Sequence, residues 1–217
     1  FIPNENILFL RAQLITGYSI IDIMRWLNYK ISNNSKNDKG LIGKLIEFYL
    51  IGKKHNHKSN QDIPYLGIEI KTITINLNNK IINDIFICSL PLVNKNVLCF
   101  YKSKLYNKLS KILWIPIIRD INIPFFKRKI GKPFFWVPTI NDKIKLNYDW
   151  NNLIKLLILG KIKNINSYNG YILSIKNKGN KKSFTKTINH LGKIISIFPK
   201  ALYFKKKFLN SLLRNNH

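Results

Sequence analysis

The chain has 217 residues and a formal net charge of +27, because 37 lysines and arginines face only 10 aspartates and glutamates. Its hydrophobic content of 46% and aromatic content of 12% exclude a disordered or fibrous protein and indicate one folded domain. This excess of positive charge favours a polyanionic partner, with nucleic acid as the first candidate. A lysine-rich composition is also typical of an AT-rich genome, so the charge supports nucleic-acid binding without deciding it.

The two cysteines, Cys88 and Cys99, have no Cys or His pattern beside them, which argues against a zinc site and favours a reduced protein. No apolar run approaches the roughly 18–20 residues that a membrane span requires. The N-terminal residues also lack the basic-then-apolar pattern of a signal peptide. We therefore expect a cytoplasmic protein with no membrane association.

The N-terminal part of the chain predicts three helices. Residues 5–28 have helical character with a break at Gly17, and Ser19 is a suitable cap for the second of two helices. Residues 41–51 form a largely apolar stretch that we expect to be a buried helix. Polar loops are expected at residues 31–39 and 52–61.

A strand is expected at residues 67–75. Apolar residues occupy every second position of this stretch, with one slip at Thr72. They are Ile68, Ile70, Ile73 and Ile75. This alternation predicts one face packed on a core, which would place Glu69 and Lys71 together on the opposite face.

The remaining sequence mixes strand-like and helix-like stretches. A turn at residues 76–80 separates the first strand from a second at 85–90 and predicts a hairpin. Further strands are expected at residues 97–101, 112–118, 170–175 and 194–198. Helices are expected at residues 149–159 and 185–191 and in the basic C-terminal region. Proline-marked turns are expected at Pro116, Pro124, Pro133 and Pro138, and a basic loop at 176–182. The mixed order predicts an α/β fold with a mixed sheet.

The segment from Asp62 to Lys71 carries the strongest chemical signal. It contains Asp62, Glu69 and Lys71 in a chain with only ten acidic residues. Two carboxylates suit Mg²⁺, which retains several waters and takes phosphate oxygens as further ligands. A lysine beside them would orient or deprotonate a water and neutralise charge on a phosphate. The alternative is a surface strand on which Glu69 and Lys71 are solvated.

Each of the other candidate functional residues also has a simple structural explanation. Glu47 would either pair with Lys44 on an exposed helix face or project toward Asp62 and Glu69. Lys108 in isolation is a solvated lysine. The basic loop from Lys176 is either solvated or reads a nucleic-acid groove, and Tyr203 is either a core residue or a contact to a base.

Several ordered segments, taken together, resemble the MutH family, the strand-discriminating endonucleases of methyl-directed DNA mismatch repair. The resemblance covers nearly the whole chain. Its segments are Asp62…Glu69-Ile-Lys71, Asp38-Lys-Gly-Leu-Ile-Gly-Lys-Leu-Ile-Glu47, Lys108-Leu-Ser-Lys-Ile-Leu-Trp-Ile-Pro116, Gly131-Lys-Pro-Phe-Phe-Trp136 and Pro199…Tyr203-Phe-Lys-Lys-Lys-Phe208.

The resemblance implies a restriction-endonuclease-like fold: one endonuclease domain over residues 1–217, with N-terminal and C-terminal lobes forming a DNA-binding cleft. It also implies Mg²⁺-dependent nicking of the unmethylated strand at hemimethylated GATC sites in double-stranded DNA. Activation by MutL, after MutS finds a mismatch, and a monomeric state are implied as well.

The resemblance also assigns roles to residues. Asp62 and Glu69 match the metal ligands, and Lys71 matches the lysine beside the scissile phosphate. Glu47 and Lys108 match further residues needed for cleavage. Lys39 and Gly40 match a DNA-contacting turn, and Phe86 matches an aromatic residue at the DNA interface. Lys176 stands at the position that reads the site, and Tyr203 matches the tyrosine near the methylated adenine.

One departure concerns Lys176, which stands where the family has an arginine. Lysine lacks the bidentate fork that fits guanine, so weaker GATC discrimination is expected. Two rival functions remain open at this point. One is a stand-alone restriction enzyme that cuts both strands, and the other is a basic nucleic-acid-binding protein without catalysis.

Overall fold

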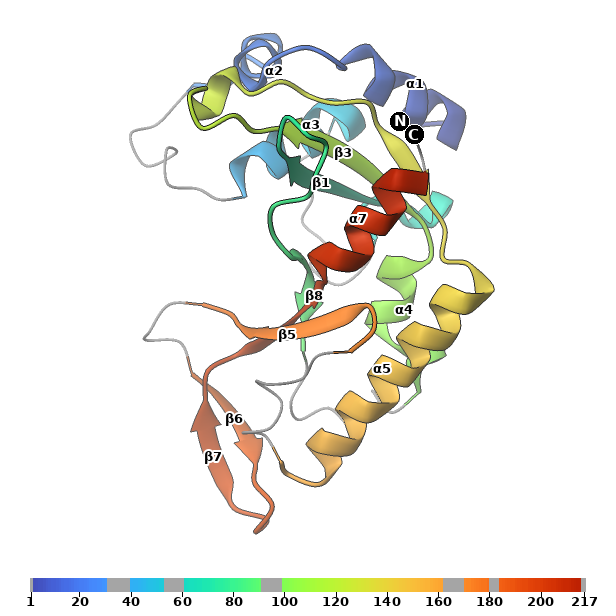
Figure 1. Cartoon of the computed structure of the whole chain (residues 1–217), viewed down its shortest axis with the longest axis vertical. Coiled ribbons are helices and arrows are strands. Elements are labelled where there is room, and N and C mark those ends of the chain that lie inside the picture. The colour runs from blue at the N-terminus through green and yellow to red at the C-terminus, as the bar shows by residue number, and fades with distance from the viewer. Residues whose placement is uncertain are drawn as a thin grey trace. The chain divides into compact units, whose positions relative to one another are not determined.

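The chain forms two structural units, each built of helices and short strands (Figure 1). The computed structural model describes residues 2–30, 40–52, 61–90, 99–161, 170–179 and 184–215. The first unit contains Phe1–Ile82 and Ser110–Val137, and the second contains Asn83–Leu109 and Pro138–Asn215. The predicted mixed α/β fold class is confirmed, and it is the class of restriction-endonuclease-like proteins.

The helices of the first unit are α1 (Glu5–Leu14), α2 (Ile20–Trp26) and α3 (Leu41–Ile51), and side-chain caps begin the first two. The Asn4 side chain accepts a hydrogen bond from the Ile7 amide at 3.0 Å, which caps α1. Ser19 and Asp22 form a capping box at the start of α2. The predicted bounds of α3 are confirmed, and Gly52, at φ 77°, ends it in a left-handed conformation.

A three-stranded sheet lies under these helices. Its order is β1 (Glu69–Ile75), β3 (Ile112–Ile118) and β4 (Phe134–Trp136), with β3 parallel to β1 and antiparallel to β4. Side chains from α1, α2 and α3 form one apolar cluster with Ile70, Leu113, Ile115 and Ile117. The helices therefore cover one face of the sheet, and β1 forms one of its edges.

A second sheet organises the other unit. β8 (Lys200–Phe204) is its central strand, flanked by β2 (Ile85–Ser89) and β5 (Leu173–Asn177), and both pairings are antiparallel. Strands β6 (Thr185–Ile188) and β7 (Ile194–Ile197) form a separate hairpin. The helices of this unit are α4 (Lys104–Leu109), α5 (Ile140–Ile158) and α7 (Lys206–Asn215).

The predicted hairpin between the first two strands is wrong. β1 and β2 belong to different sheets, and β2 pairs with β8 instead. The turn at 76–80 does reverse the chain, but it pairs only Ile81 with Ile75 before the chain enters the second unit. The partner of β2 lies near the C-terminus, which local turn signals do not reveal.

Two further secondary-structure predictions are wrong. Residues 185–191 form β6 and a turn in place of a helix, because Asn189 Oδ1 accepts the amides of Leu191 and Lys193 and closes a hairpin. The described end of the predicted strand at 97–101 is a 3₁₀ helix, Phe100–Lys102. The hydroxyl of Ser103 donates to the carbonyl of Phe100 and accepts the Tyr106 amide, which leads directly into α4.

The bounds of two elements and the setting of one proline also differ from the prediction. The strand predicted at 170–175 is β5, which runs from Leu173 to Asn177 and so takes in the first two residues of the predicted basic loop. α5 begins at Ile140, well before the predicted start at 149, because Thr139 and Asp142 form a capping box. Pro116 lies inside β3 and not in a turn. On the side away from β1, β4 pairs only with Ile112–Trp114, and residues 129–131 then take its place. There the Pro116 carbonyl accepts the Gly131 amide at 2.8 Å, so this proline enters the pairing through its acceptor.

Candidate functional site

Asp62 is placed by a tight reversal of the chain just before β1. Ile63 and Ile68 exchange two backbone hydrogen bonds, of 2.9 and 3.2 Å, across a short 3₁₀ helix, Pro64–Leu66. Gly67 closes the reversal at φ 67°, a conformation that favours glycine. Extending the antiparallel register of this bridge by one step sets Asp62 opposite Glu69. Opposite residues of an antiparallel pair project from the same face, so the two carboxylates share one face.

The Asp62 carboxylate also occupies the outer edge of β1. Glu69 donates its amide to Lys111 on the β3 side, so the next amide, that of Ile70, points away from the sheet. Asp62 Oδ2 accepts this Ile70 amide at 2.7 Å. The contact fixes the Asp62 carboxylate against the peptide bond that follows Glu69.

Glu69 and Lys71 form a short ion pair on β1. The Lys71 Nζ lies 3.0 Å from Glu69 Oε1, and the two side chains are only 11% and 4% exposed. The alternative of a solvated Glu69 and Lys71 is therefore wrong. Removing one partner of a buried ion pair leaves the other charge uncompensated, so each of these residues depends on the other.

The predicted face pattern of β1 needs one correction. The register with β3 is continuous from Glu69 to Ile75, so Thr72 introduces no slip. Ile73 and Ile75 are therefore on the face that carries Glu69 and Lys71, and Ile70 is on the face that meets the helices. The carboxylate and the ammonium are held at the end of a partly apolar face.

Glu47 lies on the side of α3 that faces β1. A Cβ at Gly43, one turn before Glu47, would contact Thr72 Oγ1 at 3.7 Å, so this stripe of the helix packs on the strand. The Oε1 atom of Glu47 is buried. The burial of this atom argues against an exposed helix face, and the predicted projection of Glu47 toward Asp62 and Glu69 stays a prediction. Gly40 directly precedes α3, and the predicted contact residue Lys39 lies outside the described residues.

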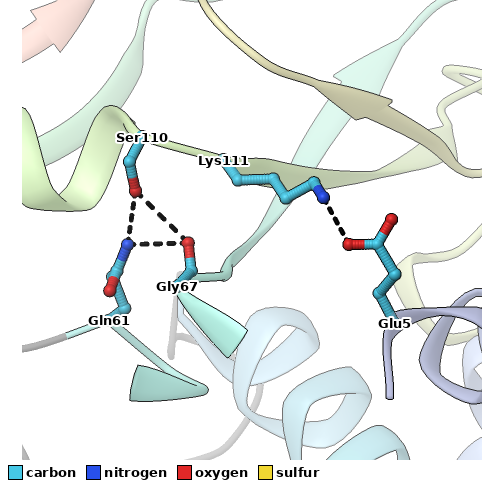
Figure 2. A network of polar contacts seen from close by, with 5 residues as sticks. All are labelled: Glu5, Gln61, Gly67, Ser110 and Lys111. Carbon is cyan, nitrogen blue, oxygen red and sulfur yellow. Dashed lines mark hydrogen bonds and ion pairs between the residues drawn. The ribbon is translucent and has the colours of Figure 1, made fainter. Parts of the chain in front are cut away.

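A polar network supports the loop that carries Asp62 (Figure 2). The Gln61 side-chain amide donates to the Gly67 carbonyl at 2.7 Å and to the Ser110 hydroxyl at 2.6 Å. Lys111, next to Ser110, forms an ion pair with Glu5 of α1. The residues on either side of the Asp62–Glu69 reversal are thereby tied to the start of β3.

The donor set in this reversal fits Mg²⁺ on chemical grounds. Carboxylate oxygens are hard ligands, and Mg²⁺ needs only one or two of them beside waters and phosphate oxygens. Within the described part of the chain, no group of three or more His, Cys, Asp or Glu side chains could hold a metal ion. Asp62 and Glu69 thus suit an ion that completes its coordination with water and substrate, and they do not suit a closed structural site.

In the second unit, three predicted contact residues lie on one face of the β2–β8–β5 sheet. Tyr203 on β8 pairs in register with Phe86 on β2 and with Ser174 on β5. The Phe86 and Tyr203 rings meet edge to face, with centroids 5.7 Å apart. Lys176 Nζ lies 5.4 Å from the Tyr203 ring centroid. Phe86, Lys176 and Tyr203 therefore form one cationic and aromatic surface, which we call the sheet-face cluster.

The opposite face of the same sheet is apolar and buried. Its fully or almost fully buried side chains are those of Ile87, Leu173, Ile175, Leu202 and Phe204. Because side chains alternate across a strand, this burial directs the sheet-face cluster away from the core of the unit. The alternative of Tyr203 as a core residue is therefore not supported.

Lys108 belongs to the second unit, in the last turn of α4, two residues before Ser110 of the first unit. Its predicted part in cleavage stays a prediction.

Comparison with known proteins identifies the family. A sequence model described as "DNA mismatch repair enzyme MutH" matches residues 51–149. The DNA mismatch repair protein MutH of Serratia proteamaculans is 36% identical over 211 residues, which cover 97% of this chain and 92% of that protein. The corresponding protein of Pectobacterium atrosepticum is 34% identical, over 97% of this chain and 91% of its own length. This chain belongs to the MutH family.

Members of the MutH family are DNA endonucleases of mismatch repair, so this protein is a DNA-cleaving hydrolase. The segment that the MutH model matches contains Asp62, Glu69 and Lys71 as well as Phe86 and Lys108. The similarity to MutH proteins extends further and spans both structural units.

Beside the sheet-face cluster, sequence reasoning missed Asp84 and did not single out Lys178 within the predicted basic loop at 176–182. Asp84 Oδ2 lies 2.7 Å from Lys176 Nζ, and Lys178 Nζ lies 4.6 Å from the Phe86 ring centroid. A signal for Lys178 existed, because residues 174, 176 and 178 share one face if the strand continues to that point. Asp84 gave only the weaker signal of an isolated acid in a basic chain.

Proposed function

We propose that this member of the MutH family nicks the unmethylated strand of double-stranded DNA at hemimethylated GATC sites, with Mg²⁺ as its metal ion. The observation that carries the proposal is the 2.7 Å hydrogen bond from the Ile70 amide to Asp62 Oδ2, next to Glu69, whose carboxylate lies 3.0 Å from Lys71 Nζ. Two carboxylates and one ammonium on the same face are the groups that phosphodiester hydrolysis needs.

Asp62 and Glu69 would hold the Mg²⁺ ion. When bound, this ion lowers the pKa of a water and neutralises charge on the scissile phosphate. The Ile70 amide keeps Asp62 in place, and Lys71 does the same for Glu69. The protein thereby fixes the direction of both carboxylates before DNA arrives, which reduces the cost of ordering the site.

Lys71 would act on the phosphate itself. Its ammonium lies beside the Glu69 carboxylate, at the N-terminal end of β1, and is mostly shielded from water. The charge of this ammonium is therefore weakly screened. It would donate a hydrogen bond to a non-bridging phosphate oxygen and stabilise the charge that develops there. We further propose that Glu47 and Lys108 are needed for cleavage, Glu47 from the strand-facing side of α3 and Lys108 from the end of α4.

The sheet-face cluster would contact the target sequence. The Lys176 ammonium would donate to guanine acceptors in the major groove, and Phe86 would pack against the DNA. Tyr203 would lie against the adenine whose methylation distinguishes the strands. Gly40, which directly precedes α3, and Lys39, which lies outside the described residues, would also contact the DNA.

The same assignment extends to partners and location. We propose that the protein works as a cytoplasmic monomer and is activated by MutL after MutS has found a mismatch. The relatives that support this are named DNA mismatch repair proteins. In the described part of the chain, no helix is both long and apolar enough to cross a membrane.

A nicking assay tests the proposal. A supercoiled plasmid with one hemimethylated GATC site is incubated with the protein and Mg²⁺, with and without MutL. The proposal expects an open circle nicked in the unmethylated strand, faster with MutL. A linear product without MutL would support the rival restriction enzyme, and DNA binding without any cleavage would support the non-catalytic rival.

A further inference from the structure

The Lys176 ammonium is held between two groups, a carboxylate and an aromatic ring. Asp84 Oδ2 lies 2.7 Å from Lys176 Nζ, and the Tyr203 ring centroid lies 5.4 Å from the same nitrogen. The Lys176 side chain is nevertheless 50% exposed, so this ammonium is restrained at the surface and not buried. A lysine normally samples many rotamers, and restraining it to one costs conformational entropy.

Asp84 itself is firmly placed. Its Oδ1 accepts the Lys206 amide at 2.8 Å at the start of α7, and its Oδ2 accepts the Ser174 hydroxyl at 3.3 Å. Its side chain is only 18% exposed. The carboxylate is thus anchored to two other elements of the same unit, α7 and β5, and can impose a position on a mobile lysine.

The negative charge of Asp84 weakens non-specific binding to DNA. Burial raises the pKa of the Asp84 carboxyl, but the hydrogen bonds from its three partners and the Lys176 charge outweigh burial and set the pKa below its ordinary value. Asp84 is therefore an anion at neutral pH, next to a surface proposed to meet a polyanion. A carboxylate there lowers non-specific attraction to phosphate, so its benefit must lie elsewhere.

We propose that Asp84 is a positioning residue that fixes the direction of the Lys176 ammonium and thereby increases discrimination for the target site. This inference rests on the proposed function, in which Lys176 reads the site. Lysine is a point donor without the planar fork of arginine, so its direction must be set by its neighbours. Asp84 and the Tyr203 ring supply that direction, and Asp84 lowers the tendency of Lys176 to bind any nearby phosphate.

Binding measurements without metal test this role independently of cleavage. Fluorescence anisotropy with EDTA gives the affinity for a GATC duplex and for a duplex with a scrambled site, at two or more salt concentrations. The proteins are the wild type, Asp84→Asn, Lys176→Ala and the double variant. Asp120→Asn is the matched control, because it removes one negative charge from a turn of the first unit.

The expected result is a loss of discrimination without a loss of affinity. In Asp84→Asn the ratio of the two affinities falls about tenfold, the scale of one good base contact. Its affinity for the scrambled duplex stays the same or rises, with a salt dependence at least as steep as that of the wild type. In the Lys176→Ala background, Asp84→Asn causes no further loss, and Asp120→Asn leaves the ratio unchanged.

Two results would overturn the positioning role. One is a wild-type affinity ratio in Asp84→Asn, and the other is an equal loss of discrimination with and without Lys176, which would mean that Asp84 acts only through the cap of α7. A thermal unfolding scan of each variant shows whether it is folded. If Asp84→Asn is unfolded, Asp84→Glu replaces it in the same binding measurements. If the wild type itself shows no preference for GATC, the proposed site specificity fails first and the positioning role fails with it.

Discussion

Asp62 accepts the amide of Ile70 at 2.7 Å, so the carboxylate that precedes β1 is bound to the strand that carries Glu69. This contact uses an edge amide of the sheet, which would otherwise need water or another chain. The Asp62 carboxylate is therefore held by a backbone amide of β1, and the Glu69 carboxylate is held by the Lys71 ammonium. The reversal at Pro64–Leu66 thus has a direct consequence for the proposed metal site.

Removing either carboxylate should abolish nicking. Asp62→Asn and Glu69→Gln keep the size of the side chain and remove the charge that would hold Mg²⁺. Loss of several kcal/mol of transition-state stabilisation corresponds to a decrease of about 10³-fold in the nicking rate. The rate is measured on a GATC plasmid, and DNA affinity is measured by anisotropy. Full activity in either variant would refute the site, and Asp120→Asn should behave as the wild type.

Removing Lys71 should destabilise the fold as well as stop cleavage. Lys71→Met keeps most of the side-chain volume but leaves the Glu69 carboxylate buried without its ammonium, which costs about 3 kcal/mol. Chemical denaturation with and without Mg²⁺ measures the effect. Because a bound cation would replace the missing charge, Mg²⁺ should stabilise this variant more than the wild type. Equal stabilisation of both proteins would argue against a metal ion at Glu69.

The Gln61 network should affect activity only by positioning the Asp62 carboxylate. Gln61→Ala removes two hydrogen bonds that tie the Asp62 loop to Gly67 and Ser110, at a cost of about 1–2 kcal/mol in unfolding free energy. Misplacing the Asp62 carboxylate should lower the nicking rate about 10–100-fold and raise the Mg²⁺ concentration needed for half-maximal activity. The chain offers Gln13→Ala as a matched control, because Gln13 is exposed on α1. An unchanged Mg²⁺ requirement in Gln61→Ala would contradict the prediction.

The ion pair of Asp84 should be visible in the pH dependence of stability. Its folded-state pKa lies below the ordinary value of 3.8, so the folded protein binds this proton less readily than the unfolded chain. Its contribution is therefore present above about pH 4 and is lost as pH falls through the lowered pKa. Denaturant unfolding of the wild type and Asp84→Asn at pH 6 and pH 3 should give a stability difference that shrinks at the acidic end. A constant difference would mean that the carboxylate charge does not contribute.

Tyr203 should influence the response to methylation more than the chemistry. Contact with one methyl group is worth about 0.8 kcal/mol, or roughly a fourfold difference in rate between methylated and unmethylated sites. Tyr203→Ser should change this ratio while the Mg²⁺ dependence stays that of the wild type. Tyr203→Phe keeps the ring and serves as the comparison. Parallel nicking assays on unmethylated and hemimethylated plasmids measure both quantities, and an unchanged ratio in both variants would exclude Tyr203 as the sensor.

Local sequence determined the elements whose signals are contiguous. The bounds of α3 and β3 follow from apolar runs that end at a glycine or at polar residues, and the capping box at Ser19 begins α2 where expected. The Asp62–Lys71 segment is equally local, because a tight reversal and one strand are enough to bring Asp62, Glu69 and Lys71 onto the same face.

Tertiary structure alone decided how distant segments pair. β2 finds β8 near the other end of the chain, and the ion pair between Asp84 and Lys176 exists only because β2 and β5 flank the same central strand. The β6–β7 hairpin differs, because its partner strand follows after a short turn that Asn189 closes, and the β-branched Thr185, Thr187 and Ile188 favour a strand. Strand pairing is set by contacts between residues far apart in sequence, and such contacts leave no mark in a local window of residues.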